Sequence, residues 1–526
     1  MHRDIQAMSA RCSSPRKSPR RAAMTLILDP TNIDLPTLRR LWHGEPARLD
    51  GASLDRVRAS AASVERIVAG GETVYGINTG FGLLANTRIP PERLAELQKN
   101  LILSHSCGLG DPLPRRVVRL MVILKLLGLG RGYSGVRPLI VERLQALLDH
   151  DALPVIPAQG SVGASGDLAP LAHLIAALLG EGQFDIGGET VPARDAISKL
   201  GMEPLALGPK EGLALINGTQ ASTAIALDAL FSAERMLGAA IGAGAMSVDA
   251  LKGSVKPFDP RISESRGQPG QIRVAAEIRS LLEGSAILAS HGRCGRVQDP
   301  YSFRCQPQVM GACLDLLTAA ARTLTIEAGA VTDNPIVFED VDEAISGGNF
   351  HAQPVAFASD MISMAMCEVG SLSERRTAVL IDPKMSGLPA FLTDDGGVNS
   401  GMMIPQVTQA ALVAENRSLA FPASVDSVPT SAGQEDHVSM APIAARKAAA
   451  ITRNVAGIVG VELIAAAQGV DYHQPLATSD RLRQLHSAVR AISPRLGADR
   501  YWADEMARLQ SALLEGGCNL LPTILD

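Results

Sequence analysis

Residues 160–170 read Gly-Ser-Val-Gly-Ala-Ser-Gly-Asp-Leu-Ala-Pro. The centre of this stretch, Ala164-Ser165-Gly166, joins three of the smallest residues, and the glycines around it permit tight folding where a Cβ atom would clash. Folding this tight can bring the amide nitrogen of Gly166 onto the carbonyl carbon of Ala164. Loss of water from the resulting ring and from Ser165 leaves a methylidene-imidazolone, an electrophile made from the backbone alone. Taken alone, the tripeptide is far more often an ordinary loop, so the rest of the chain has to decide.

The residues after this tripeptide predict a helix. Asp167 is a good N-cap, the segment from Leu168 to Leu179 is apolar, and Gly180 is suited to end a helix. The positive end of that helix would point back at the ring and favour negative charge that develops there.

The composition indicates a large aliphatic core and excludes several classes of partner. Hydrophobic residues make up 46% of the 526 residues but aromatic ones only 3%, too few for the base-stacking surfaces of nucleic-acid-binding proteins. A net charge of −5 also argues against a polyanionic partner. No apolar run reaches the roughly 18 residues of a membrane span, so we expect no membrane partner.

Cysteine and histidine usage argues against disulfides and metal sites. The seven cysteines are odd in number, scattered and without a Cys-x-x-Cys pair, and the ten histidines show no metal-ligand spacing. Free thiols are typical of a reducing compartment, so we expect a cytoplasmic protein without a bound metal.

The first 23 residues differ from everything after them. They are basic, poor in apolar residues and unable to bury a core, and they lack the apolar region of a secretory signal. We expect a disordered basic tail or a mis-assigned start, with Met24 opening the folded part. An Arg- and Ser-rich transit peptide is the alternative.

From Met24 onward the chain predicts one compact, mainly α fold. Apolar residues recur at helical spacing, and Ala and Leu supply most of the apolar faces. We expect short β segments near 184–191 and 331–338, an N-terminal lobe over 24–200, and a central helical bundle with C-terminal helices over 201–526. The long helices are expected at 219–250, 305–330, 351–380, 402–420 and 437–468.

The loops between these helices contain polar residues that suggest chemistry. Each one alone has a plain structural explanation, because glycine-rich loops form turns, Asn217 suits a helix N-cap and Arg304 suits a surface ion pair. The motifs are Tyr75-Gly-Ile-Asn-Thr-Gly-Phe-Gly, Leu103-Ser104-His105, Ala164-Ser165-Gly166, Leu213-Ala-Leu-Ile-Asn217-Gly-Thr-Gln, Gln298-Asp-Pro-Tyr301-Ser-Phe-Arg304 and Ser431-Ala-Gly-Gln434-Glu435-Asp-His.

Together and in this order, the motifs resemble the histidine ammonia-lyase family from about residue 24 to the last residue. The resemblance implies a long central helical bundle of the ammonia-lyase and fumarase-like type, with a smaller N-terminal lobe that carries the electrophile loop. It implies a homotetramer with composite active sites, a methylidene-imidazolone made from the chain's own residues, and no added cofactor. The implied reaction is non-oxidative deamination of L-histidine to trans-urocanate and ammonia, the first step of histidine degradation.

The resemblance also assigns catalytic roles. It places the electrophile at Ala164, Ser165 and Gly166, and it takes Tyr75 as the base that removes the β-proton of the substrate. This proton is weakly acidic, so the reaction needs an electron sink bonded to the substrate and a base close by. Tyr301 is counted with the catalytic residues and is implied to come from a neighbouring subunit.

Further positions match residues that bind the substrate. Arg304 matches the arginine that holds the substrate carboxylate, a task suited to a planar guanidinium. His105 and Glu435 match the pair that faces the imidazole. The residues implied to surround the electrophile and the carboxylate are Asn217, Gln298 and Phe350.

Two positions depart from the usual pattern of the family. Phe421 stands where histidine is common, and Gly433 stands where asparagine is common. Both precede Glu435 and bear on how its side chain is positioned.

Three alternative functions compete with this interpretation. Residues 130–135 spell Gly-x-Gly-x-x-Gly, typical of a dinucleotide site in a dehydrogenase, but the run before them contains Arg119 and Lys125 and is Leu-rich at helical spacing. A catalytically inactive relative is disfavoured because every candidate catalytic position is filled. An aminomutase uses the same electrophile and adds the amine back, and only product analysis separates it from a lyase.

The electrophile assignment predicts the outcome of replacing Ser165 by Ala. Without the hydroxyl there is no second water to lose, so Ser165→Ala should keep at least the encoded mass less one water and should lose nearly all turnover. Intact-mass spectrometry and an activity assay check both expectations. Full activity in Ser165→Ala would show that the electrophile is not made here.

Overall fold

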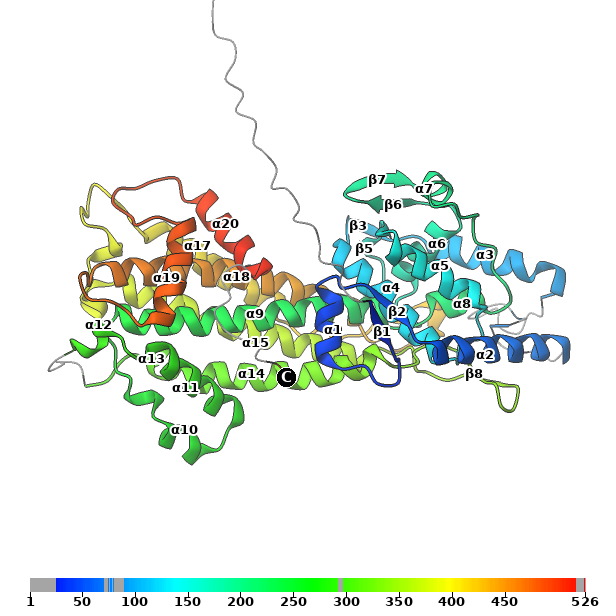
Figure 1. The fold of residues 1–526 in the computed structure, drawn as a ribbon, viewed down its shortest axis with the longest axis horizontal. Helices are drawn as coiled ribbons and strands as arrows, with labels where there is room; N and C mark the ends of the chain where they lie inside the picture. Colours follow the sequence, from blue (N-terminus) through cyan, green and yellow to red (C-terminus); the bar gives the residue numbers. More distant parts are fainter. Residues whose placement is uncertain are drawn as a thin grey trace, which may run out of the picture.

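A computed structural model describes residues 25–70, 74, 76–77, 79, 89–291, 297–516 and 525. It is mainly helical and elongated, with long helices that run lengthwise and a group of shorter elements at one end (Figure 1). The prediction of a mainly α fold is confirmed. The tail predicted over residues 1–23 lies outside the described residues.

The elements that precede α9 are mostly short and gather mainly at one end of the molecule, on the right in Figure 1. They form two two-stranded sheets, parallel β1-β2 and antiparallel β3-β5, and one antiparallel three-stranded sheet, β4-β6-β7. Their bounds are β1 Leu26–Leu28, α1 Leu35–Trp42, β2 Ala47–Leu49, α2 Gly51–Gly70, the 3₁₀ turn η2 Pro91–Arg93, α3 Leu94–His105, β3 Leu109–Pro112, α4 Arg115–Gly130, α5 Pro138–Asp149, β4 Ala152–Pro154, β5 Pro157–Gln159, α6 Leu168–Leu178, β6 Gln183–Ile186, β7 Glu189–Pro192, α7 Ala193–Lys199 and α8 Glu211–Ile216.

The rest of the chain forms the helical bundle and returns twice to the first group of elements. Helices α9, α15 and α18 pack against one another, with α14 and α17 packed beside them. The bounds are α9 Gln220–Ala250, η3 Lys256–Phe258, α10 Pro260–Arg266, α11 Pro269–Leu282, α12 Ala286–Ala289, α13 Tyr301–Arg304, α14 Gln306–Ala328, β8 Ile336–Phe338, β9 Glu343–Ile345, α15 Gln353–Ile381, α16 Pro383–Ser386, η4 Ala390–Leu392, α17 Met403–Leu419, η5 Ser431–Gly433, α18 Ala441–Asp471, α19 Asp480–Ile492 and α20 Ala503–Glu515.

The two returning segments bring residues from the bundle half of the sequence to the site described below. The antiparallel hairpin β8-β9 packs on α2, where Val337 joins Val64 and Ile77 in a small apolar cluster. The segment after η5 reaches the loop before α6, because the backbone N–H of Met440 donates to the carbonyl of Val162 at 2.9 Å.

All five long helices predicted from the sequence are present, and each observed end lies close to the expected one. Their small residues explain how they pack so closely. A Cβ atom on Gly244 of α9 would lie 1.9 Å from Gln306 Oε1 at the start of α14, so a larger residue would force the buried Gln306 side chain to move. Interiors packed this closely tolerate little change in side-chain volume.

The structure also shows whether the Gly-x-Gly-x-x-Gly motif at residues 130–135 has the surroundings of a dinucleotide-binding site. The apolar run before it is helix α4, and the first glycine of the motif, Gly130, is the last residue of that helix. A dinucleotide-binding fingerprint requires a strand followed by a helix at this point, so the dehydrogenase alternative is wrong.

Three helices are long and apolar enough to cross a membrane when judged by length and composition: α14, α15 and α18. The expectation that no segment reaches this length is therefore wrong. In the structure, 67% of the apolar stretch of α15 and 72% of that of α18 are buried, against 44% of that of α14.

One buried ion pair joins the three central helices. Arg376 on α15 and Glu462 on α18 are both fully buried, and Arg376 donates from Nε and Nη2 to the two carboxylate oxygens at 2.5 and 2.7 Å. Ser247 on α9 donates from Oγ to the same carboxylate at 2.8 Å. Because both charges are desolvated, each depends on the other for its stability.

Removing one partner of this pair should destabilise the protein strongly. Glu462→Ala leaves the Arg376 charge buried and unpaired, and we expect a loss of about 3 to 5 kcal/mol in the free energy of unfolding. The double variant Arg376→Met with Glu462→Leu should lose much less, because it removes both charges. Denaturant unfolding measures all three proteins, and equal losses in the single and double variants would contradict the coupling.

Candidate active site

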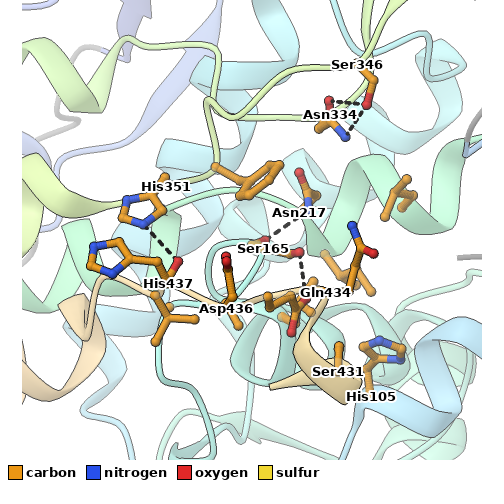
Figure 2. A pocket seen from close by; sticks show the side chains of 18 of the residues that line it. His105, Ser165, Asn217, Asn334, Ser346, His351, Ser431, Gln434, Asp436 and His437 are labelled. Carbon is orange, nitrogen blue, oxygen red and sulfur yellow. Dashed lines mark hydrogen bonds between the residues drawn. The ribbon is translucent and has the colours of Figure 1, made fainter. Parts of the chain in front are cut away.

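A cavity of about 840 Å³ lies where the returning segments meet the first group of elements, and Figure 2 shows its wall. It is lined by the end of α3, the loop before α6, the end of α8, the loop before α15 and the segment before α18. The sequence-predicted residues that line it are His105, Ala164, Ser165, Asn217, Phe350 and Glu435.

The tripeptide predicted to form the electrophile is held in a strained backbone conformation. Ser165 has φ +51°, and its neighbours Gly163 and Gly166 have φ +79° and +77°. A Cβ atom at Gly166 would lie 2.3 Å from the carbonyl oxygen of Gly218, and one at Gly163 would lie 2.2 Å from Ser439 Oγ. Only glycine fits at these two positions, and a loop compressed in this way fits the formation of a ring from its own backbone.

The loop is held against the junction of α8 and α9. Asn217, which follows the last residue of α8, donates from Nδ2 to the carbonyl of Ser165 at 3.0 Å (Figure 2). The next residue, Gly218, accepts a hydrogen bond from the backbone N–H of Asp167 at 2.7 Å. Asn217 therefore ends a helix and binds the loop, and the plain explanation that it caps the start of a helix is wrong.

Asp167 has a different role from the one that the sequence predicted. It occupies the N-cap position of α6, but its side chain makes no capping hydrogen bond there. Its carboxylate instead accepts from the backbone N–H and the hydroxyl of Ser222, at 2.6 and 2.9 Å, in the first turn of α9. The backbone amides at the start of α9 favour a negative charge just as those at the start of α6 would. Asp167 and Ser222 are both fully buried at α9. Burial raises the pKa of Asp167 to about 6.

Glu435 lies directly against the strained loop. Its carboxylate accepts from the hydroxyl of Ser165 at 2.9 Å and from the hydroxyl of Thr430 at 2.8 Å. These two bonds fix one acidic group beside the predicted electrophile.

His105 presents one ring nitrogen as an acceptor. Its Nδ1 lies 2.8 Å from the carbonyl oxygen of Leu101 and 3.0 Å from the Ser104 hydroxyl. The carbonyl can only accept and the hydroxyl can donate to that carbonyl at 3.1 Å, so we assign the proton of the neutral ring to Nδ1. Nε2 is then the acceptor nitrogen. His105 and Glu435 both line the cavity, as the sequence predicted.

Two histidines in the cavity wall were not singled out from the sequence. The rings of His351 and His437 stack with centroids 5.8 Å apart and planes 7° from parallel, and His351 Nε2 lies 3.3 Å from the carbonyl oxygen of His437 (Figure 2). His437 ends the motif that begins at Ser431, and His351 directly follows Phe350, but only Phe350 and Glu435 are predicted site residues there. Only the contact between the two segments could have identified the pair.

Three predicted residues lie away from the cavity within the single chain. Tyr301 and Arg304 belong to α13, at the far end of the bundle, and Gln298 directly precedes it (Figure 1). Tyr301 is 71% exposed, and the Arg304 guanidinium lies 4.5 Å from the centroid of its ring. Tyr75, the predicted base, lies outside the described residues.

Phe421 and Gly433, the two departures from the family pattern, lie in different surroundings. Phe421 is exposed and does not line the cavity. Gly433 has φ +87° in the turn before Gln434, a conformation that glycine adopts freely and asparagine tolerates, so the turn is compatible with either residue.

A family model described as aromatic amino acid lyase matches residues 33–491. This chain belongs to the aromatic amino acid lyases.

Individual members of the aromatic amino acid lyase family match nearly the whole chain. The histidine ammonia-lyase of Paracidovorax citrulli is 58% identical over 490 residues, 93% of this chain and 96% of that protein. The crystal structure of histidine ammonia-lyase from Trypanosoma cruzi matches with a TM-score of 0.87 and 39% identity, covering 96% of this chain and 98% of that one. Tyrosine aminomutase from Streptomyces globisporus matches with a TM-score of 0.89 and 35% identity, covering 94% and 97%.

The raised pKa of Asp167 predicts a pH-dependent contribution to the stability of this lyase. A carboxyl group whose pKa is higher in the folded state stabilises the protein fully below its unfolded pKa, and this contribution is lost as the pH rises through about 6. Asp167→Asn cannot ionise, so between about pH 4.5 and 7.5 the unchanged protein should lose about 2 kcal/mol relative to it. Unfolding of both proteins across this range measures the difference, and parallel curves would contradict the assignment.

Proposed function

We propose that this chain is a histidine ammonia-lyase, which removes ammonia from L-histidine without oxidation and releases trans-urocanate. The observation that carries the proposal is one cavity in which the strained Ala164-Ser165-Gly166 loop lies beside His105 and Glu435. The high identity to a protein named histidine ammonia-lyase over 93% of the chain supports the same substrate.

We further propose that the tripeptide forms the methylidene-imidazolone and that the enzyme needs no added cofactor. The ring supplies an electrophilic carbon that takes up electron density from the bound substrate. The Asn217 amide, which donates to the Ser165 carbonyl oxygen at 3.0 Å, stabilises negative charge on that oxygen.

The polar wall of the cavity favours an imidazole ring over a benzene ring. The Glu435 carboxylate and the acceptor nitrogen of His105 can each receive an N–H donor. An imidazole ring offers one such donor when neutral and two when protonated, whereas the benzene ring of phenylalanine offers none. A benzene ring placed against the partly buried Glu435 carboxylate would displace water from it without offering an N–H donor in return, so the cavity discriminates against phenylalanine.

The remaining assignments require a second subunit. We propose a homotetramer in which Gln298, Tyr301 and Arg304 of one chain complete the site of another, with Arg304 holding the substrate carboxylate and Tyr75 acting as base. The long helices support this, because several carry exposed apolar side chains that a partner would cover. These side chains are Ile326, Phe357, Met364, Ile404 and Val407. We place the enzyme in the cytoplasm because Cys107, Cys305, Cys313 and Cys367 are free thiols.

An aminomutase is the second candidate, because the structural match to tyrosine aminomutase is as good as the match to histidine ammonia-lyase. The fold therefore does not separate the two reactions. Product analysis does, since a lyase releases ammonia and urocanate whereas an aminomutase returns a β-amino acid.

The substrate proposal predicts the outcome of a kcat/KM panel on L-histidine, L-tyrosine and L-phenylalanine. Histidine should be deaminated, and the other two should react roughly 10⁴-fold less efficiently, the discrimination available to a site built to bond a polar group. His105→Phe and Glu435→Gln should damage histidine turnover far more than any residual activity on the others. A preference for tyrosine or phenylalanine would refute the substrate assignment.

Composite sites predict complementation between two inactive variants. Tyr75→Phe and Tyr301→Phe chains should each be nearly inactive, but tetramers that contain both should have some sites with two intact tyrosines. Co-expression of the two should therefore restore part of the activity, measured after mixed assembly is confirmed by differently tagged chains. Mixed tetramers no more active than either parent would mean that the two tyrosines belong to the same chain's site.

A further inference from the structure

A buried lysine lies behind the electrophile loop without contacting the cavity. Lys125 comes from α4 and is only 2% exposed. Its Nζ donates to the carbonyl oxygens of Ala214 and Asn217 at 3.2 and 3.0 Å, at the end of α8. In the part of the chain that the structure describes, its hydrogen-bond partners are thus two backbone carbonyls and no carboxylate.

Placing an ammonium group here is unfavourable for stability. Burial lowers the pKa of Lys125 to about 8, which reflects the free energy lost on removing the charge from water. A nearby lysine shows the ordinary solution, because the fully buried Lys210 pairs with the Asp333 carboxylate at 2.7 Å. Because the partners of Lys125 are backbone carbonyls, we infer that Lys125 holds the backbone at Ala214 and Asn217 in place.

That backbone is the support of the loop. The same Asn217 whose carbonyl accepts from Lys125 donates from its side chain to the Ser165 carbonyl at 3.0 Å. The next residue, Gly218, lies against Gly166, where a Cβ atom would come within 2.3 Å of the Gly218 oxygen. A shift of the Asn217 peptide would therefore loosen the compression at both Ser165 and Gly166.

We propose that Lys125 is a positioning residue for ring formation, which fixes the Asn217-Gly218 peptide so that it compresses the Ala164-Ser165-Gly166 loop. In the first step the Gly166 nitrogen bonds to the Ala164 carbonyl carbon, and the carbonyl oxygen leaves as water with the amide protons of Ser165 and Gly166. In the second step Ser165 loses its Cα proton and its hydroxyl as water and gains a Cα=Cβ double bond. Both steps are dehydrations and need no oxidant.

The inference rests on the proposed function, since it assumes that the loop cyclises. The intact mass of the unchanged chain tests that assumption separately. If the unchanged chain has its encoded mass, the proposed electrophile fails whatever Lys125 does. If it lacks two waters, the variants below test Lys125 alone.

The experiment compares the full-length variants Lys125→Met, Lys125→Arg and Lys210→Met. Lys125→Met removes the charge and the donors at similar length, Lys125→Arg keeps both, and Lys210→Met removes a matched buried ammonium that does not bond the loop support. The folded fraction of each is isolated by size-exclusion chromatography soon after synthesis, and its intact mass is followed over time. Ser165→Ala provides the reference for a chain that cannot complete the two losses.

We expect folded Lys125→Met to lose its two waters roughly ten-fold or more slowly than the unchanged chain, which corresponds to about 1.4 kcal/mol in the barrier. Lys125→Arg should recover most of the rate, and Lys210→Met should lose both waters normally. A merely structural lysine would change the amount of folded protein but not the mass of that protein.

Two results would overturn the proposal. One is a folded Lys125→Met that loses both waters as fast as the unchanged chain, and the other is an equal defect in Lys210→Met. Should Lys125→Met not fold, Lys125→Gln, which keeps N–H donors without the charge, is judged by the same criterion. Failure of both to fold would assign Lys125 to stability and would also overturn the proposal.

Discussion

The contact between Gly166 and Gly218 is the constraint on which the site depends. A Cβ atom at Gly166 would lie 2.3 Å from the Gly218 carbonyl oxygen, so this position accepts no side chain, and the Asp167 N–H donates to the same oxygen at 2.7 Å. The Asp167 carboxylate then bonds Ser222 in the first turn of α9. The strained loop is thereby attached to a helix of 31 residues that is almost wholly buried, and strain of this kind persists only where the surrounding structure holds it.

The bundle provides that surrounding structure and also sets where the other functional residues lie. Its long helices are rich in alanine and glycine, so they approach closely and act as a stiff frame. The loop lies at one end of this frame, and Tyr301 and Arg304 lie at the other (Figure 1). The residues proposed for the site therefore lie at opposite ends of a single chain, which is the physical reason for proposing an assembly.

The sequence predicted the helices well because their packing follows the helical period. The long buried helices have apolar residues at every turn, and their ends fall at polar or glycine-rich segments, so local pattern and tertiary structure agree. The site was predicted mainly by resemblance. Asn217 and Glu435 were placed correctly in the cavity wall, although no local rule indicates that they lie within hydrogen-bonding distance of Ser165.

The failures around the site share one cause, which is that long-range polar contacts leave no periodic signal. Asp167 has the sequence context of an N-cap, yet its carboxylate bonds a helix that starts more than fifty residues later. Lys125 was useful only as an argument against a strand, and its partners on α8 lie about ninety residues away. The stacked rings of His351 and His437 likewise join two segments distant in sequence.

Asp167 and Lys125, the two buried ionisable groups beside the loop, both bind backbone groups although burial destabilises their charged forms. Burial shifts the pKa of Asp167 upward and that of Lys125 downward, so each is driven toward its neutral form and each lowers the stability of the fold when charged. Apolar side chains of similar volume would avoid this loss, but they could not bond the backbone groups at Ser222 and Asn217. These backbone groups belong to the helix ends on either side of Gly218, the residue that compresses the loop. On the proposed role of Lys125, the fold gives up stability here to fix the position of the Asn217-Gly218 peptide, and the extensive apolar core of the bundle offsets that loss.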